Sequence, residues 1–182
     1  MKKLIIGMIG LVCSLQFASA QQKGGILGKT APEIQVDQWV HIPKGEKAPT
    51  KASLKDKVVY MYCYQSWCPG CHSSGFPTLK EVSEKFKDSD DVEFIVVHTV
   101  FEGFGINTPA KWKSVATRHG LEHLRFAHSG SLKQESHIMA DFKTRGTPWT
   151  VIIGKDGVVK FNDFHIQPDK AVELINKLKG DK

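Results

Sequence analysis

The chain has 182 residues, a formal net charge of +6, 41% hydrophobic residues and four cysteines. This length is enough for one ordinary domain. The lysines and arginines are spread along the sequence without a block of interleaved aromatic residues, so nucleic acid is excluded as an expected partner.

The N-terminal segment has the three parts of a secretory signal peptide. Lys2 and Lys3 form a short positive region, residues 4–15 are mostly apolar, and Ala18-Ser19-Ala20 has the small-x-small pattern of a cleavage site. The apolar run is too short to span a bilayer comfortably, and no second long apolar segment follows it. An uncleaved membrane anchor is the alternative interpretation.

This reading divides the chain into three parts. We expect residues 1–20 to be the signal peptide, residues 21–33 a flexible leader and residues 34–182 the folded domain. The protein would then be exported and not embedded in a membrane after cleavage. Its place would be the periplasm in a Gram-negative bacterium, and otherwise it would be secreted or tethered to a membrane.

Strand patterns and helix patterns alternate along the predicted domain. The predicted strands are 34–40, 58–64, 92–100, 124–127 and 149–153, and a hairpin turn leads from the last of these into a strand at 158–161. The predicted helices are 69–87, 109–119, 132–142 and a last helix from 168. The alternation predicts an α/β fold in which a central mixed sheet is flanked by helices.

Cys68 and Cys71 stand where the buried strand 58–64 gives way to a helix. A CxxC pair in this place can cycle between dithiol and disulfide. With Pro69 in the first helical turn, Cys68 lies at the helix N-terminus, where free N–H groups and the helix dipole favour a thiolate. We therefore expect Cys68 to be the nucleophile and Cys71, one turn deeper, to resolve the mixed disulfide, with Trp67 shielding the sulfur.

Two other interpretations of Cys68 and Cys71 are a static disulfide and half of a metal site. A zinc site would need further ligands, and the sequence has no second CxxC or CxxH. A bridge that closes so small a loop would restrain the unfolded chain little. No metal or organic cofactor is therefore implied. A second signal, Thr147-Pro148 after Gly146, directly precedes the strand 149–153, and its proline is either cis or an ordinary loop proline.

These features together resemble the thioredoxin superfamily. The resemblance rests on Trp67-Cys68-Pro69-Gly70-Cys71 after the buried strand, Pro77 in the next helix, and Gly146-Thr147-Pro148 before a late hairpin. The chain also has a signal peptide and an inserted β-α segment between the CxxC helix and the cis-Pro strand. In these two features it resembles exported thiol-disulfide oxidoreductases of the TlpA/ResA type. The similarity covers roughly residues 30–180.

The resemblance implies a thioredoxin-like fold and roles for particular residues. Cys68 would be the nucleophile, Cys71 the resolving thiol, and Pro148 a cis proline beside Cys68, while the Thr147 backbone would pair with the substrate chain. Partners would be protein thiols or disulfides and a membrane-linked redox protein.

Three positions depart from the superfamily pattern. Thioredoxins carry a buried acid six residues before the first cysteine, and here that residue is Tyr62, so proton transfer to or from Cys71 needs another group. Pro77 comes six rather than five residues after Cys71, so the helix either starts differently or holds a bulge. The Pro69-Gly70 spacer reverses the order in thioredoxin itself, so no redox potential can be carried over.

Several further residues have two possible roles each. Glu102 is a candidate proton acceptor or a solvated loop residue, and His72 either stabilises a nearby thiolate or is a plain exposed helix residue. Cys63 is expected to be a small buried hydrophobe, with a third redox thiol as the alternative. His119 and His123 could share a helical face as metal ligands, but the intervening glycine and the lack of nearby acids argue against it.

The sequence therefore predicts an exported thiol-disulfide oxidoreductase that acts through Cys68 and Cys71. One alternative is a copper-binding or copper-delivery module that uses these two cysteines and a histidine. The other is a thiol peroxidase, which would need a threonine and a proline just before its reactive cysteine. Residues 58–67 contain neither.

Overall fold

A computed structural model describes residues 25–180 of the chain. The predicted signal peptide, residues 1–20, lies outside this range and stays a prediction. Among the described residues, no helix combines the length and the apolar character that crossing a lipid bilayer requires.

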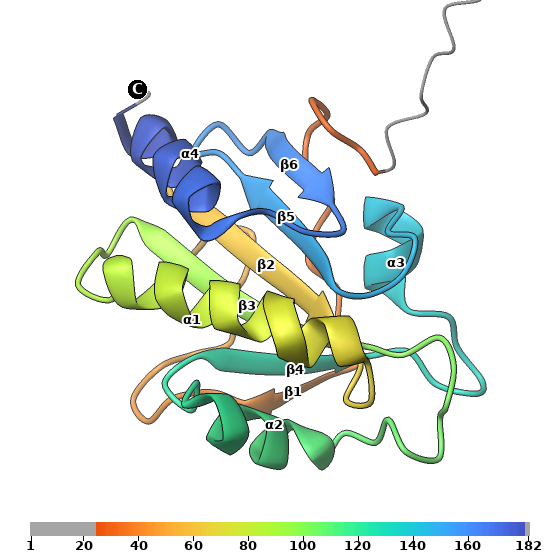
Figure 1. Ribbon diagram of the computed structural model, residues 1–182. Helices are drawn as coiled ribbons and strands as arrows, with labels where there is room; N and C mark the ends of the chain where they lie inside the picture. Colours follow the sequence, from red (N-terminus) through yellow and green to blue (C-terminus); the bar gives the residue numbers. More distant parts are fainter. Residues whose placement is uncertain (1–24, 181–182) are drawn as a thin grey trace, which may run out of the picture.

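Six strands form one mixed sheet in the order β1-β4-β3-β2-β5-β6 (Figure 1). The central three, β2, β3 and β4, are parallel, while β1, β5 and β6 run antiparallel to their neighbours. The predicted α/β fold with a central mixed sheet is confirmed. The strands are β1 (Gln38–His41), β2 (Val58–Tyr64), β3 (Val92–Thr99), β4 (Arg125–Ser129), β5 (Trp149–Ile153) and β6 (Val159–Asp163).

Strand β2 lies in the middle of the sheet, and all of its residues are buried. Successive side chains of a strand point to opposite faces. Tyr60, Tyr62 and Tyr64 therefore enter the core on one face, and Met61 and Cys63 enter it on the other. A continuous apolar and aromatic run is what a strand covered on both sides requires.

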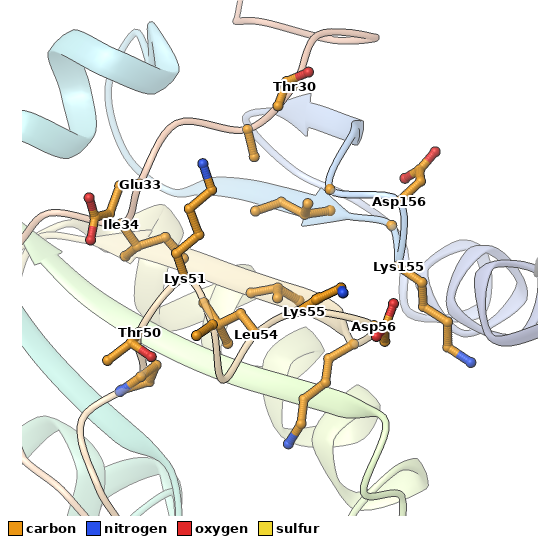
Figure 2. A pocket seen from close by; sticks show the side chains of 18 of the residues that line it. Thr30, Glu33, Ile34, Thr50, Lys51, Leu54, Lys55, Asp56, Lys155 and Asp156 are labelled. Atoms are coloured by element: carbon orange, nitrogen blue, oxygen red, sulfur yellow. The ribbon is translucent and has the colours of Figure 1, made fainter.

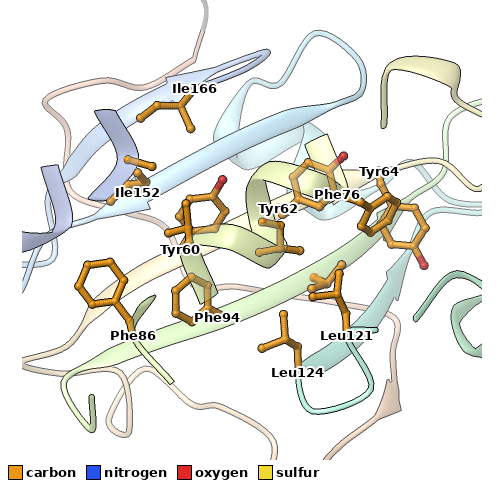
Figure 3. Packing of buried hydrophobic residues seen from close by; sticks show 14 of the residues in the cluster. Tyr60, Tyr62, Tyr64, Phe76, Phe86, Phe94, Leu121, Leu124, Ile152 and Ile166 are labelled. Atoms are coloured by element: carbon orange, nitrogen blue, oxygen red, sulfur yellow. The ribbon is translucent and has the colours of Figure 1, made fainter. Parts of the chain in front are cut away.

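Three helices cover the face that carries the tyrosines: α1 (Phe76–Lys85), α2 (Lys111–His119) and α4 (Pro168–Gly180). Figure 3 shows Tyr62 and Tyr64 beside Phe76 of α1. The ring centroid of Phe76 lies 5.0 Å from that of each tyrosine. Burying a large apolar side chain contributes about 1.5–3 kcal/mol. This packing fixes α1, and with it the turn that carries the cysteines, against the end of β2.

Helix α3 (His137–Phe142) and the segment before β1 cover the opposite face. Part of that segment pairs with β6. The Gly28 N–H donates to the Val159 carbonyl and the Val159 N–H donates to the Lys29 carbonyl, at 2.8 and 2.9 Å. Residues 28–30 are thus paired with the edge of the sheet and Ile26 is buried, within the range 21–33 for which the sequence pattern predicts a flexible leader.

An apolar cavity of about 770 Å³ remains on this second face, below the loop that precedes β2 (Figure 2). Ile34, Leu54 and Val59 line it, and the exposed Lys51 and Lys55 stand at its rim. The cavity adjoins the start of β2, whereas the cysteines follow the end of that strand. At about 3.3 Å per residue, the strand separates the two by roughly 20 Å, so the cavity takes no part in the site described below.

Two elements begin at least four residues later than their patterns predict. Helix α3 starts at His137 instead of residue 132, because the Ser136 hydroxyl accepts the Met139 N–H at 3.3 Å and caps the helix there. Strand β1 starts at Gln38 instead of residue 34, because pairing with β4 begins only there.

Candidate functional site

The helix that carries the cysteines begins at Pro69, as predicted. Its first bond runs from the His72 N–H to the Cys68 carbonyl, at 3.3 Å. Proline suits this first turn because its missing N–H would have no partner there in any case. Cys68 therefore stands at the start of the helix, and its sulfur accepts a hydrogen bond from the backbone N–H of Cys71.

One wide turn interrupts the helix directly after this start. Residues Cys71–Gly75 are π-helical, and the Phe76 N–H bonds to the Cys71 carbonyl five residues back. The bulge is one of the two outcomes that the displaced Pro77 predicts. The wide turn absorbs the extra residue and leaves Pro77 in the first turn of α1, where a missing N–H costs little.

The two thiols differ in accessibility. Cys68 is 7% exposed and Cys71 is fully buried. The Cys71 N–H donates to Cys68 Sγ at 3.3 Å, and the Cys68 thiol donates to the Thr147 carbonyl at 3.5 Å. The cysteines of the described range, which include Cys63, are free thiols. Cys68 is therefore the less buried of the two redox-candidate cysteines.

Burial, followed by the adjacent Cys68, raises the pKa of the Cys71 thiol to about 12. A backbone hydrogen bond with Gln65 and a side-chain hydrogen bond with Thr147 act in the opposite direction. Reduced Cys71 is consequently protonated at neutral pH. It needs a proton acceptor before it can attack a disulfide.

The segment Thr147-Pro148 lies directly against the cysteine turn. Its peptide bond is cis, as the resemblance to the thioredoxin superfamily implies. A Cβ atom on Gly70 would stand 3.3 Å from Pro148 Cδ, so a glycine in the spacer allows this close approach. The structure thus brings together the CxxC turn and the Thr-Pro segment, which sequence reasoning singled out separately.

Tyr62 occupies the place of the buried acid that thioredoxins carry. Its hydroxyl donates to the Cys71 carbonyl at 3.3 Å, and a Cβ atom on Gly75 would overlap that hydroxyl. Burial raises the pKa of Tyr62 well above its usual range, and the nearby Cys71 adds to the effect. Tyr62 is therefore a neutral group that holds the backbone of Cys71 and cannot take the part of a carboxylate.

His72 links the cysteine turn to α2. Its Nε2–H donates to the Ser66 carbonyl at 2.8 Å, and its Nδ1 lies 2.8 Å from Nε2 of His119. Burial, followed by the charges of His72, Arg118 and Lys80, lowers the pKa of His119 to about 4. Both ring nitrogens of His72 are thus engaged, and within residues 25–180 neither forms a hydrogen bond with a cysteine sulfur. Sequence spacing alone could not reveal the contact between His72 and His119.

A buried asparagine organises the segment before the first cysteine. Asn107 Oδ1 accepts from the Ser66 N–H at 3.0 Å, from the Ser66 hydroxyl at 2.7 Å and from His98 Nε2 at 3.0 Å. Its Nδ2 donates to Gln65 Oε1 at 3.3 Å and to the Glu102 carbonyl at 3.0 Å. Sequence reasoning missed Asn107 and His98, because neither belongs to a motif and both lie far from the CxxC pair in the chain.

Trp67 and Glu102 lie on the exposed rim of the site. Trp67 is 47% exposed, and a Cβ atom on Gly103 would stand 3.5 Å from its Nε1. Glu102 is exposed, and within residues 25–180 its carboxylate forms no hydrogen bond or salt bridge. Its part as a proton acceptor for Cys71 stays a prediction.

Cys63 packs in the core on the sheet face opposite to Cys68 and Cys71. Burial raises the pKa of its thiol to about 12. Both observations favour its interpretation as a small buried hydrophobe. Within the described part of the chain, no group of three or more histidine, cysteine or acidic side chains is arranged to hold a metal ion. His119, weighed above as a metal ligand, instead contacts His72.

A mixed sheet with a CxxC pair at the start of a covering helix, and a cis proline against it, defines a thioredoxin-like protein. Within that class the chain belongs to the Redoxin family, whose model matches residues 27–176. No curated protein sequence matches the chain significantly.

Solved structures share the fold. A thioredoxin-like superfamily protein is 26% identical, with a TM-score of 0.71, and the match covers 84% of this chain and 97% of that one. A thiol-disulfide isomerase from Corynebacterium glutamicum is 23% identical, with a TM-score of 0.71 and coverage of 84% and 98%. The thioredoxin domain of a thiol-disulfide oxidoreductase from Bacteroides vulgatus is 17% identical, with a TM-score of 0.62 and coverage of 85% and 98%.

Proposed function

We propose that this protein is an exported thiol-disulfide oxidoreductase of the TlpA/ResA type, which exchanges a disulfide with protein thiols through Cys68 and Cys71. One observation carries the proposal: the sulfur of Cys68, the less buried of the two cysteines, is hydrogen-bonded to both the Cys71 N–H and the Thr147 carbonyl, close to the fully buried Cys71. Membership of the Redoxin family and the likeness to a thiol-disulfide isomerase support this reaction class.

The exchange proceeds in two balanced steps. The Cys68 thiolate attacks one sulfur of a substrate disulfide, which breaks the substrate bond, forms a mixed disulfide and releases the first substrate thiolate. The Cys71 thiolate then attacks Cys68 Sγ and releases the second substrate thiolate. The substrate gains two electrons and the protons of the two cysteines, and Cys68 and Cys71 are left as a disulfide. The same steps in reverse oxidise a substrate dithiol.

The surrounding residues hold this geometry. Trp67 covers one side of the Cys68 sulfur, and the Pro69-Gly70 spacer begins the helix and lets Pro148 approach. In this proposal the Thr147 backbone pairs with an extended substrate chain beside Cys68. His72 braces the turn through Ser66. The electron pair passes between sulfur atoms, so the exchange itself calls for no cofactor.

The resolving step depends on removal of a proton from Cys71. Because the pKa of the buried Cys71 thiol is raised, this step calls for a proton acceptor near neutral pH. Glu102 is the proposed proton acceptor, reaching Cys71 when the loop that contains it moves over the site. The neutral hydroxyl of Tyr62 holds the Cys71 backbone meanwhile.

The proposed location follows from the predicted signal peptide at residues 1–20. Exported thiol pairs meet an oxidising compartment, where a pair that acts repeatedly must be returned to its starting state by a redox partner. We assign this part to a membrane-linked protein. The compartment is the periplasm in a Gram-negative bacterium, and the protein is otherwise secreted or tethered to a membrane.

Trapping of the mixed disulfide tests the function. The Cys71→Ser variant is mixed with a peptide that contains one disulfide, and adducts are mapped by mass spectrometry under non-reducing conditions. We expect a stable adduct on Cys68, because the variant lacks the thiol that would release it. Cys68→Ser is the matched control and should form no adduct. Failure of Cys71→Ser to form an adduct, or an adduct on Cys63, would overturn the proposal.

A further inference from the structure

A small polar cavity of about 280 Å³ adjoins the CxxC turn. Ser66, Trp67 and His72 form the wall on the side of the cysteines, and Lys111, Val115 and Arg118 of α2 form the opposite wall. Trp67 directly precedes Cys68, so this cavity begins one residue from the reactive sulfur. It is distinct from the large apolar cavity of Figure 2, at the other end of β2.

The basic side chains of this cavity share one face of α2. Lys111, Val115 and Arg118 are separated by four and three residues, which places them in line on a helix. Val115 is buried in the core and anchors the face, while Lys111 and Arg118 are exposed on either side of it. The helix thus holds two cations at fixed spacing beside the active site.

These two cations have no intramolecular counterion among residues 25–180. The salt bridges of this range involve other lysines and Arg125, and no aspartate or glutamate lines the cavity. The hydroxyls of the walls are engaged internally: Ser66 donates to Asn107 Oδ1, and Ser114 donates to the Lys111 carbonyl. Within the described residues, the free hydrogen-bond donors of the cavity are therefore the Lys111 ammonium, the Arg118 guanidinium and the Trp67 indole N–H, and only the first two carry a charge.

The neighbouring His119 reports the same positive potential. Its pKa is lowered first by burial and then by the charges of His72, Arg118 and Lys80. Lys80 stands near the C-terminal end of α2, since a Cβ atom on Gly120 would lie 3.3 Å from its Nζ. Lys80 of α1 and Arg118 of α2 thus both add positive charge beside His119.

We propose that this cavity receives a carboxylate of the thiol or disulfide substrate, carried one or two residues from the reacting sulfur. The inference rests on the proposed exchange through Cys68. An arginine guanidinium binds a carboxylate through two parallel hydrogen bonds, and a lysine adds a second charge. Successive residues of a chain lie about 3.8 Å apart, so an acidic side chain next to a substrate cysteine reaches the wall beyond Trp67.

The test compares disulfide-linked peptides that differ only in the residue after cysteine, which is Asp in one and Asn in the other. The rate constant for attack by Cys68 is measured for the wild type and for the double variant Lys111→Gln/Arg118→Gln. Two charges about 4 Å apart in water interact by about 1 kcal/mol, which corresponds to about fivefold in rate. We expect the wild type to prefer the Asp peptide about fivefold and the double variant to lose the preference.

Lys113→Gln is the matched control, because Lys113 is exposed on the other side of α2 and does not line the cavity. It should keep the preference, and 0.5 M salt should weaken the preference in the wild type. The Asn peptide corrects for any general change in the reactivity of Cys68. Equal rates for both peptides with the wild type, or a preference that survives in the double variant, would overturn the inference.

Two further measurements distinguish the substrate-carboxylate proposal from related outcomes. Oxidised glutathione, a small disulfide with carboxylates, shows whether the cavity also serves a free small disulfide, and its rate should fall in the double variant if it does. If neither peptide reacts with the wild type at all, the proposed exchange fails, which is a different result from a reaction without charge preference.

Discussion

Asn107 joins three parts of the candidate site through one side-chain amide. It binds the backbone and hydroxyl of Ser66, the ring of His98 and the carbonyl of Glu102. Asn107 is buried, and unmet hydrogen bonds of buried groups cost about 1–3 kcal/mol each. These bonds hold the segment before Cys68 against the loop that contains Glu102. The proposed movement of Glu102 toward Cys71 would therefore be hinged at Asn107.

The buried ring of His98 predicts a loss of stability in acid. Burial lowers the pKa of His98 from 6.5 to about 4. Between these values the unfolded chain binds a proton that the folded chain does not, so the free energy of unfolding falls as the pH decreases from about 6.5 to 4. Above pH 6.5 the contribution is fully present. The difference between the two pKa values corresponds to on the order of 3 kcal/mol.

The comparison uses His98→Gln, which keeps an N–H donor for Asn107 but does not titrate. Urea unfolding at pH 7 and pH 4.5 should show a smaller loss of stability in this variant than in the wild type, by about 2–3 kcal/mol. His123→Gln changes an exposed histidine and should keep the whole loss. The same pH dependence in His98→Gln and the wild type would contradict the explanation.

At this scale, the sequence predicted residues that belong to motifs. The pair Cys68 and Cys71 and the segment Thr147-Pro148 were found from their spacing and context, and the structure places them together. Asn107 and the contact between His72 and His119 were not found, because single polar residues carry no spacing signal. Their positions follow only from the packing of α2 and the loop before it against the CxxC turn.

At the scale of elements, the π-helical turn Cys71–Gly75 joins three features that the sequence shows separately. Pro77 is displaced by one residue, Tyr62 replaces an acid, and Gly75 lacks a side chain. The wide turn takes up the extra residue, and Gly75 leaves room for the Tyr62 hydroxyl to reach the Cys71 carbonyl. The resolving thiol is thus positioned by a tyrosine and a glycine that fit one another.

Gly75→Ala tests this fit. In an ordinary helix this change would stabilise the protein by up to about 1 kcal/mol, because alanine has the higher helix propensity. Here the added Cβ would overlap the Tyr62 hydroxyl, and overpacking costs about 1–3 kcal/mol. We therefore expect a lower urea midpoint. Ser73→Ala, at an exposed position of the same turn, should change stability by less than about 0.5 kcal/mol. A stabilised Gly75→Ala variant would show that the fit is absent.

The bounds of helices and strands were predicted best where the element is fully buried. Strands β2 and β5 have the predicted bounds, because a continuous apolar run bounded by turn residues leaves little choice. Helix α3 was predicted five residues too long, since its start depends on the Ser136 cap and not on periodicity. The bulge was foreseen only as one of two outcomes, and the choice between them required the packing of Tyr62.

At the scale of the whole molecule, the segment between the CxxC helix and the Thr-Pro strand supplies much of the site. It contributes His98 from β3, Asn107 from the following loop, and Lys111, Arg118 and His119 from α2. Strand order explains this, because β3 lies directly beside β2 in the sheet (Figure 1). The alternation of strands and helices predicted the mixed sheet, but it could not give the order of the strands or the side of the site on which α2 lies.

The central claim is that Cys68 and Cys71 form one reversible redox pair, and a titration in glutathione buffers measures it most directly. The protein is equilibrated at graded potentials and alkylated, and the state of each cysteine is read by mass spectrometry. We predict that Cys68 and Cys71 convert together, in one two-electron step with a midpoint between about −270 and −120 mV, while Cys63 stays a thiol. Both cysteines remaining thiols throughout, or a disulfide that includes Cys63, would contradict the account.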